Sequence, residues 1–138
     1  MLGAAKDLSA VGALVVDRSF AELKPILDAQ LPHNTTLPSI FFPGGELASE
    51  LFEMNPNLRP VDDGRGLPGR AFLFFHGSAD NYVPLANATE LKTASTNRDT
   101  ELVIVPGAGH IKAYRTDPNL YLSTLYAFVD RQIAEHHG

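Results

Sequence analysis

The stretch AFLFFHG at residues 71–77 is a run of five apolar residues that passes directly into a histidine and a glycine. A continuous apolar run of this length, closed by residues that turn the chain, is typical of a strand buried on both faces of a parallel sheet. Two other runs have the same form: Val11–Val16 ends at an aspartate, and Glu101–Val105 ends at a proline and a glycine. The three runs predict three buried strands.

Helical patterns lie between and after these runs. Ser19 and Glu22 have the spacing of a capping box, which favours a helix start there. A shorter helix is expected at Gly45–Met54, a third one around Pro84, and a last one behind Asp117 as N-cap. The apolar faces expected for the four helices are Phe20, Leu23, Leu27 and Leu31; Leu47, Leu51 and Phe52; Leu85, Ala88 and Leu91; and Leu122, Leu125, Val129 and Ile133.

The order of these elements predicts an α/β fold, with a short three-stranded parallel sheet and helices on both faces. Residues 1–138 are interpreted as a single domain, as the length suggests. Residues 32–69 are rich in Pro, Gly and Asn and are expected to form a long surface excursion. The first strand would leave an apolar edge, which we expect another segment or molecule to cover.

Composition and charge exclude several classes of function. The chain has 11 basic and 16 acidic residues, a net charge of −5, and no dense basic stripe. A nucleic-acid partner and attraction to anionic membranes are therefore not expected. No apolar run approaches the roughly 20 residues of a membrane span, and no basic segment with a long apolar core follows Met1. The sequence is interpreted as a soluble chain without a secretory signal, with the cytoplasm as the default location.

No metal or cofactor is expected. Cysteine is absent, which excludes disulfides, thiolate ligands and a cysteine nucleophile. His33, His136 and His137 lack a third ligand at a convincing spacing. The glycines of residues 107–109 lack the third glycine of a dinucleotide-binding loop.

The residues that could carry chemistry follow the predicted strands, because the carboxyl ends of parallel strands are where α/β proteins gather ligands and catalytic groups. HGSADNYVP at residues 76–84 follows one strand and PGAGH at residues 106–110 follows the next. These two motifs resemble the acid and histidine motifs of the α/β-hydrolase family, in its prolyl-oligopeptidase-like and esterase-like branches. The resemblance extends over the whole chain, through residues 14–23 and 57–62, and implies the C-terminal half of that fold.

The resemblance implies that His110 is a general base and that Asp80 orients it. The chemistry agrees, since a carboxylate that accepts the Nδ1 proton leaves Nε2 free to take a proton from a nucleophile. Each residue also has a plain structural explanation, Asp80 as a turn or cap residue and His110 as a loop histidine. His76 is expected to pack or bond locally at the end of its strand.

The sequence departs from the family at the nucleophile. The family places its serine in Gly-x-Ser-x-Gly at a sharp strand-to-helix turn, and no such pentapeptide occurs in the 138 residues. The resemblance would place it just before Met1, and it implies that an oxyanion-hole strand is missing as well. Ser78 and Ser19 are the candidate replacements, although Ser78 suits a turn and Ser19 a helix cap; Ser123, inside the last helix, is a weaker one. A water molecule or a residue from another chain is the alternative.

Two functions from different classes remain open. The first is a serine-hydrolase-type enzyme that cleaves a small-molecule ester or related acyl bond, using Asp80 and His110 without a cofactor. The second is a truncated or split half of the fold that catalyses nothing and associates through its first strand. Its partner would be a second copy or a complementary N-terminal half.

Overall fold

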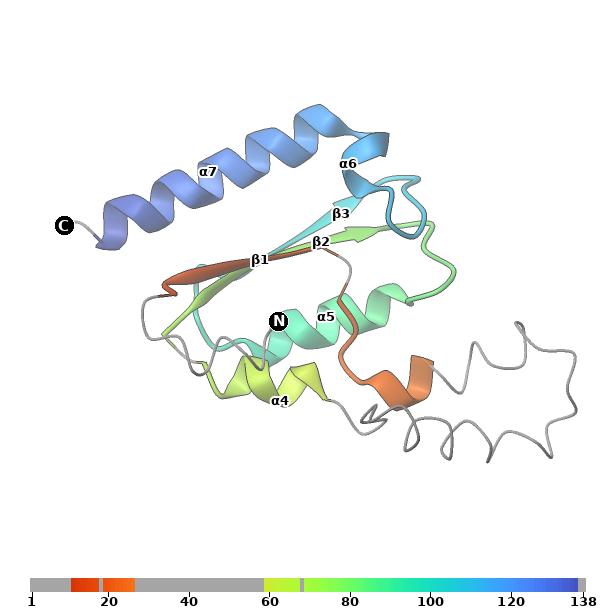
Figure 1. Ribbon diagram of the computed structural model, residues 1–138, viewed down its shortest axis with the longest axis horizontal. Coiled ribbons are helices and arrows are strands. Elements are labelled where there is room, and N and C mark those ends of the chain that lie inside the picture. The colour runs from red at the N-terminus through yellow and green to blue at the C-terminus, as the bar shows by residue number, and fades with distance from the viewer. Residues whose placement is uncertain (1–10, 18, 27–58, 68, 137–138) are drawn as a thin grey trace, which may run out of the picture.

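The computed structural model describes residues 11–17, 19–26, 59–67 and 69–136 (Figure 1). Within these ranges the chain forms a parallel three-stranded sheet in the order β1-β2-β3. The strands are β1 (Ala13–Asp17), β2 (Ala71–Gly77) and β3 (Glu101–Val105), and the labelled helices are α4 (Pro60–Arg65), α5 (Leu85–Ala94), α6 (Ala113–Thr116) and α7 (Pro118–His136). The predicted α/β class and the three-stranded parallel sheet are confirmed.

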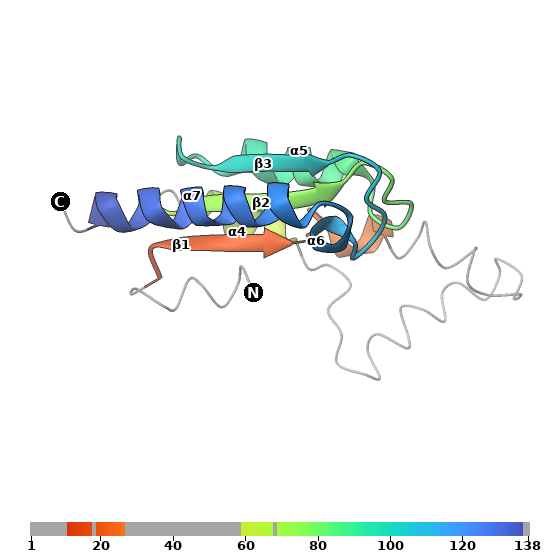
Figure 2. The ribbon, with the colours of Figure 1, turned by 90° about the horizontal axis from the view of Figure 1, so that it is seen from above.

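The helices cover the sheet on both faces, as predicted. α4 and α5 lie on one side of it and α7 lies on the other (Figures 1 and 2). Side chains alternate along β2 between these layers, because successive residues of a strand point to opposite faces. Phe72 and Phe74 pack with Val61 and Leu91 on the first side. On the second side, Ala71, Leu73 and Phe75 pack with Phe128 of α7.

The three strands differ in burial. All seven residues of β2 are buried, since strands flank it on both sides and helices cover both faces. The prediction of burial on both faces is wrong for β1 and β3, which lie at the two edges of the described sheet and are only partly buried. Ile104 in β3 is 43% exposed. An apolar run therefore identified all three strands but could not tell the centre of the sheet from its edges.

The last helix begins where the sequence predicts. The Asp117 side chain accepts a hydrogen bond from the backbone N–H of Leu120 at 2.9 Å, as an N-cap does. The predicted apolar face is partly wrong, because Val129 and Ile133 are 37% and 52% exposed while Phe128 is buried. The buried stripe is rotated by one residue, which is about 100° around a helix of 3.6 residues per turn.

The capping box predicted at Ser19 and Glu22 is wrong. Helical backbone begins at residue 23, and the Ser19 hydroxyl donates instead to the Phe20 carbonyl at 3.4 Å. Glu22 forms an ion pair with Arg59 at 2.7 Å, so its carboxylate is drawn away from the helix start. Pro25 is the third helical residue and lies within the first turn. Backbone N–H groups in the first turn form no hydrogen bond within the helix, so the N–H that proline lacks is not needed there.

The remaining helices show where local patterns succeeded and failed. The helix expected around Pro84 is confirmed as α5, which starts one residue after the proline. The helix expected at Gly45–Met54 lies outside the described residues, as does most of the surface excursion expected at residues 32–69. The short helices α4 and α6 were not predicted. None of the described helices is long and apolar enough to cross a membrane.

Candidate active site

The two predicted motifs lie side by side at the carboxyl end of the parallel strands. β2 and β3 are parallel neighbours, with His76 opposite Ile104 and Gly77 opposite Val105. Two loops therefore leave the sheet at the same end. We call residues 78–84 the acid loop and residues 106–112 the histidine loop.

The acid loop is wrapped around the carboxylate of Asp80. Its Oδ1 atom accepts hydrogen bonds from the backbone N–H groups of Tyr82, at 2.8 Å, and of Val83, at 3.0 Å. The backbone N–H of Asp80 donates to the Gly77 carbonyl at 3.2 Å. Aspartate favours such turns because its short side chain can bond its own backbone two residues on. Asp80 is therefore a turn residue, as one interpretation of the sequence has it, but the turn uses only one of the two carboxylate oxygens.

The second oxygen of Asp80 meets the predicted base. Asp80 Oδ2 lies 2.9 Å from His110 Nδ1, and the Asp80 side chain is 2% exposed while that of His110 is 30% exposed. The Tyr82 ring lies against the imidazole, with ring centroids 5.1 Å apart. Among the described residues nothing forms a hydrogen bond with Nε2 of His110. The pair thus has a buried carboxylate at one end and, at the other, a ring nitrogen without a hydrogen-bond partner among the described residues.

The environment keeps Asp80 ionised. Burial alone would raise its pKa, but the hydrogen bonds from Val83, His110 and Tyr82 outweigh burial and hold the pKa below its usual range. A carboxylate that stays charged accepts the Nδ1 proton of His110 and fixes the imidazole tautomer.

The two loops are held together by close backbone contacts. Ser78 N–H donates to the Val105 carbonyl at 3.0 Å, and Ala79 N–H donates to the Ala108 carbonyl at 2.9 Å. The Ser78 hydroxyl accepts a hydrogen bond from Gly107 N–H at 2.8 Å. Gly107 has a φ of +72°, a conformation that glycine adopts without strain. These links fix the distance between Asp80 and His110 through the backbone.

The backbone is strained directly after His110. Ile111 has a φ of +65°, which is costly for a β-branched side chain, and it is 57% exposed. The turn is closed by Lys112 N–H, which donates to the Gly109 carbonyl at 3.1 Å. Strain of this kind persists where surrounding contacts hold it, and it occurs often at functional sites.

The candidate nucleophiles have other contacts. Ser78 binds Gly107 and Ser19 binds its neighbour Phe20, and within the described chain neither bonds to His110. Ser123 donates to the Leu120 carbonyl within α7. The acid and base positions are thus brought together, whereas no serine joins them among residues 11–17, 19–26, 59–67 and 69–136.

The same part of the chain offers no metal site. No group of three or more histidine, aspartate or glutamate side chains gathers there at metal-binding distance. His33 and His137 lie outside the described residues, and the side chain of His136 is not described.

Comparison with known proteins identifies the family. The model of the prolyl oligopeptidase family matches residues 25–136. The chain belongs to the prolyl oligopeptidase family. No curated protein matches this chain. The family match covers both loops of the site and the helices that flank them, and it agrees with the resemblance drawn from the two motifs.

Solved structures share the fold at low sequence identity. An esterase of Pyrococcus furiosus has a TM-score of 0.73 and 16% identity, over 96% of this chain and 48% of its own. An α/β hydrolase from a Medee basin deep-sea metagenome library has a TM-score of 0.61 and 17% identity, over 94% and 60% of the two chains. Thermogutta terrifontis esterase 2, in a structure phosphonylated by sarin, has a TM-score of 0.54 and 23% identity, over 90% and 44%. The chain spans about half the length of the esterases it matches.

Sequence reasoning missed the contacts that assemble the site. The sequence predicts Ser78 as a nucleophile or a turn residue, and it does not indicate the link from Ser78 to a backbone 29 residues away. His76 was expected to bond locally, and its Nε2 atom does lie 3.0 Å from the Val83 carbonyl. The spacing of His76 and Val83 within one motif was the available signal.

Proposed function

We propose that this chain supplies the acid–base part of an active site that hydrolyses carboxylic esters, with His110 as general base and Asp80 as the residue that orients it. The observation that carries the proposal is the 2.9 Å contact between His110 Nδ1 and a carboxylate that is 2% exposed. Burial alone would raise the pKa of Asp80, but its hydrogen bonds hold the pKa below its usual range. The carboxylate therefore stays charged although it is buried.

The chemistry follows from the tautomer. With the proton on Nδ1, the Nε2 lone pair takes the proton of an attacking hydroxyl while the hydroxyl oxygen bonds to the ester carbonyl carbon. The imidazolium then passes that proton to the alkoxide that leaves. Water repeats the cycle on the acyl intermediate and releases the acid. Asp80 stabilises the imidazolium in both halves without taking up a proton.

We further propose that the attacking hydroxyl reaches Nε2 from outside the described residues. Ser78 is engaged with Gly107 N–H in the link between the loops. Ser19 lies after β1 and binds the Phe20 carbonyl. A serine of this chain beyond the described ranges would reach a ring nitrogen that forms no hydrogen bond with a described residue.

Labelling with a fluorophosphonate, which reacts covalently with activated serines, tests this arrangement. The wild-type chain is compared with His110→Ala, Ser78→Ala and Ser19→Ala, and the labelled peptide is identified by mass spectrometry. We expect labelling in Ser78→Ala and Ser19→Ala at the wild-type site, and its loss in His110→Ala. A label on Ser78 or Ser19 would contradict an outside nucleophile, and labelling independent of His110 would contradict its role as base.

One surface favours a second candidate function, an inactive half that associates through β1. Within the described chain β1 pairs only with β2. A groove of about 320 Å³ runs between β1 and α7, with Val15, Val129, Gln132 and Ile133 among its lining residues. Gln132 is 8% exposed, and its Nε2 atom has no hydrogen-bond partner in the described ranges. The groove thus combines apolar side chains with a buried donor.

For this second candidate we propose the complementary half of the fold as the partner, because the chain spans about half the length of the esterases it matches. A strand laid beside β1 would supply a backbone carbonyl and cover the apolar groove. The isolated chain lacks that half, so we expect its uncovered β1 edge to pair with the same edge of a second copy, and light scattering over a range of concentrations tests this pairing. We expect self-association that Ile133→Asp abolishes and Tyr126→Asp leaves intact, since Tyr126 is exposed on α7 but does not line the groove. A monomer at every concentration would contradict this candidate.

A further inference from the structure

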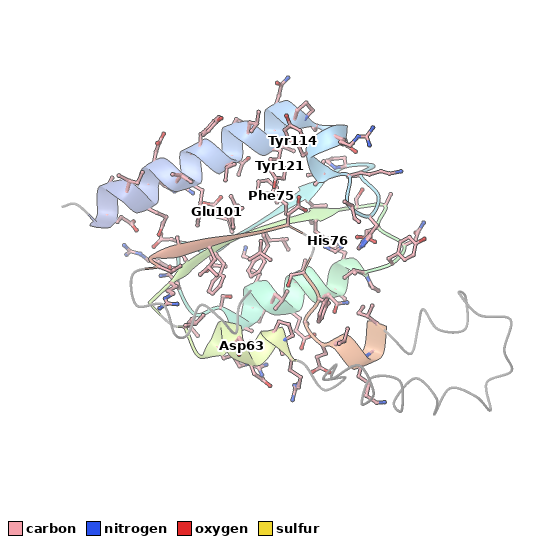
Figure 3. All side chains as sticks on the ribbon, in the orientation of Figure 1. Asp63, Phe75, His76, Glu101, Tyr114 and Tyr121 are labelled. Atoms are coloured by element: carbon pink, nitrogen blue, oxygen red, sulfur yellow. The ribbon has the colours of Figure 1, made fainter. Side chains whose placement is uncertain are left out.

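A second histidine, His76, lies buried beneath the acid loop. It is 1% exposed and occupies the last position but one of β2. Its neighbour Phe75 faces the α7 layer, whereas His76 lies on the α5 side of the sheet (Figure 3). Burying an imidazole is costly unless it forms a hydrogen bond.

That hydrogen bond goes to the acid loop. Nε2 of His76 lies 3.0 Å from the carbonyl oxygen of Val83, a residue that is 5% exposed. A carbonyl only accepts, so Nε2 carries the proton and donates it. In the described part of the chain the other nitrogen, Nδ1, has no partner. His76 is therefore tied to the loop through Nε2 alone.

Val83 passes this constraint to the site. Its carbonyl is held by His76, and its N–H donates to Asp80 Oδ1 at 3.0 Å. The other carboxylate oxygen of Asp80 meets His110 Nδ1 at 2.9 Å. A continuous line of hydrogen bonds thus runs from the buried strand to the base, and each link has a distance at the mode for its type.

We infer that His76 is a positioning residue, which fixes Val83 so that the Asp80 carboxylate is aimed at His110. The geometric part of this inference concerns only the Asp80–His110 hydrogen bond. Its consequence for rate rests on the proposed function. Filling space does not by itself explain a histidine at this position. Another side chain of similar size would fill the same space, but it would leave the buried Val83 carbonyl without its hydrogen-bond donor.

Three substitutions separate the tether from packing. His76→Gln places an amide nitrogen near the position of Nε2 and keeps the donor. His76→Asn is the matched control, because its amide nitrogen lies near the position of Nδ1 and cannot reach Val83. His76→Leu keeps an apolar volume and removes the donor.

The readout is the pair of imidazole nitrogen shifts of His110, measured by long-range ¹H–¹⁵N correlation at a pH near 8.5, where ordinary histidines are neutral. The His110 signals are assigned by their loss in His110→Gln. We expect a protonated Nδ1 and a bare Nε2 in wild type and in His76→Gln. In His76→Asn and His76→Leu we expect the shifts to move toward a mixture of tautomers. This signature does not respond to a general loss of stability as long as the variant is folded.

The outcomes are distinct. Wild-type shifts in folded His76→Leu and His76→Asn would overturn the inference, and so would mixed tautomers in folded His76→Gln. If His76→Asn and His76→Leu, which leave the Val83 carbonyl without a donor, do not fold, His76→Gln alone decides. Bare Nδ1 in the wild type would contradict the Asp80–His110 hydrogen bond itself. Expected shifts in all variants together with no ester hydrolysis by the wild type would uphold the role of His76 and contradict the proposed function.

Discussion

The backbone of Gly77 lies so close to Ala108 that a methyl group on Gly77 would overlap the Ala108 carbonyl group. This contact joins the end of β2 to the histidine loop, three residues before Asp80 on one side and two before His110 on the other. The absence of a side chain at Gly77 is therefore a condition for the two loops to meet.

Gly77→Ala is expected to push the loops apart. Overpacking of this kind costs about 1–3 kcal/mol of stability. We expect a lower urea midpoint and a larger loss of the proposed ester hydrolysis than the loss of stability explains, because the Asp80–His110 distance changes. Gly69→Ala is the matched control, since Gly69 is exposed and nothing lies within 4 Å of an added methyl group. Equal behaviour of the two variants would contradict this account of the contact.

Asp80→Asn is expected to reverse the His110 tautomer. Tyr82 and Val83 both donate to Oδ1, so the amide oxygen of asparagine takes that position and the amide nitrogen faces His110. Nδ1 then becomes an acceptor and Nε2 carries the proton, which removes the base. The rate of ester hydrolysis should fall by up to about 10⁴-fold, the scale seen for this change in serine proteases. A folded Asp80→Asn protein with wild-type turnover would show that Asp80 does not orient the base.

The stability of the fold should depend on pH through Asp80. Burial alone would raise the pKa of Asp80 in the folded chain, but the hydrogen bonds from Val83, His110 and Tyr82 lower it by more. The contribution of ionised Asp80 to the free energy of unfolding is therefore complete above the pKa of aspartate in the unfolded chain, about 3.9. It is lost as the pH falls through the lower pKa of Asp80 in the folded chain. Urea unfolding of wild type and Asp80→Asn should show a difference in stability at pH 7 that shrinks below about pH 4. A difference that does not change with pH would refute this linkage.

Ser78→Ala tests whether Ser78 is a tether or a nucleophile. Loss of its hydrogen bond with Gly107 N–H should cost about 1 kcal/mol, because the exposed N–H can bind water instead. The proposed ester hydrolysis should slow less than about 10-fold, whereas removal of a nucleophile would abolish covalent catalysis. Kinetics and urea unfolding of the same preparation give both quantities. Complete loss of activity in a folded variant would identify Ser78 as the nucleophile.

The parts of the fold that follow from local pattern were predictable. AFLFF at residues 71–75 is apolar on both faces because β2 is buried on both, and Asp117 caps α7 with its own side chain. Asp80 and His110 could be paired because they follow neighbouring parallel strands within motifs that resemble a known family.

The parts decided by distant contacts were not predictable. The capping box at Ser19 failed because Arg59, 37 residues from Glu22, binds that carboxylate. Helical spacing could not show that α7 presents Phe128 rather than Val129 to the sheet. The links from Ser78 to Gly107 and from Gly77 to Ala108 depend on how two strands are aligned, which neither motif contains by itself.

The most direct test of the Asp80–His110 pair is the rate of p-nitrophenyl acetate hydrolysis by highly purified wild-type protein beside His110→Ala prepared identically. Removal of a general base typically costs at least about 10²-fold in rate. We expect the wild type to exceed His110→Ala by that factor at neutral pH, with both proteins folded. Equal rates for the two proteins would contradict the claim that this chain supplies the base of an ester hydrolase.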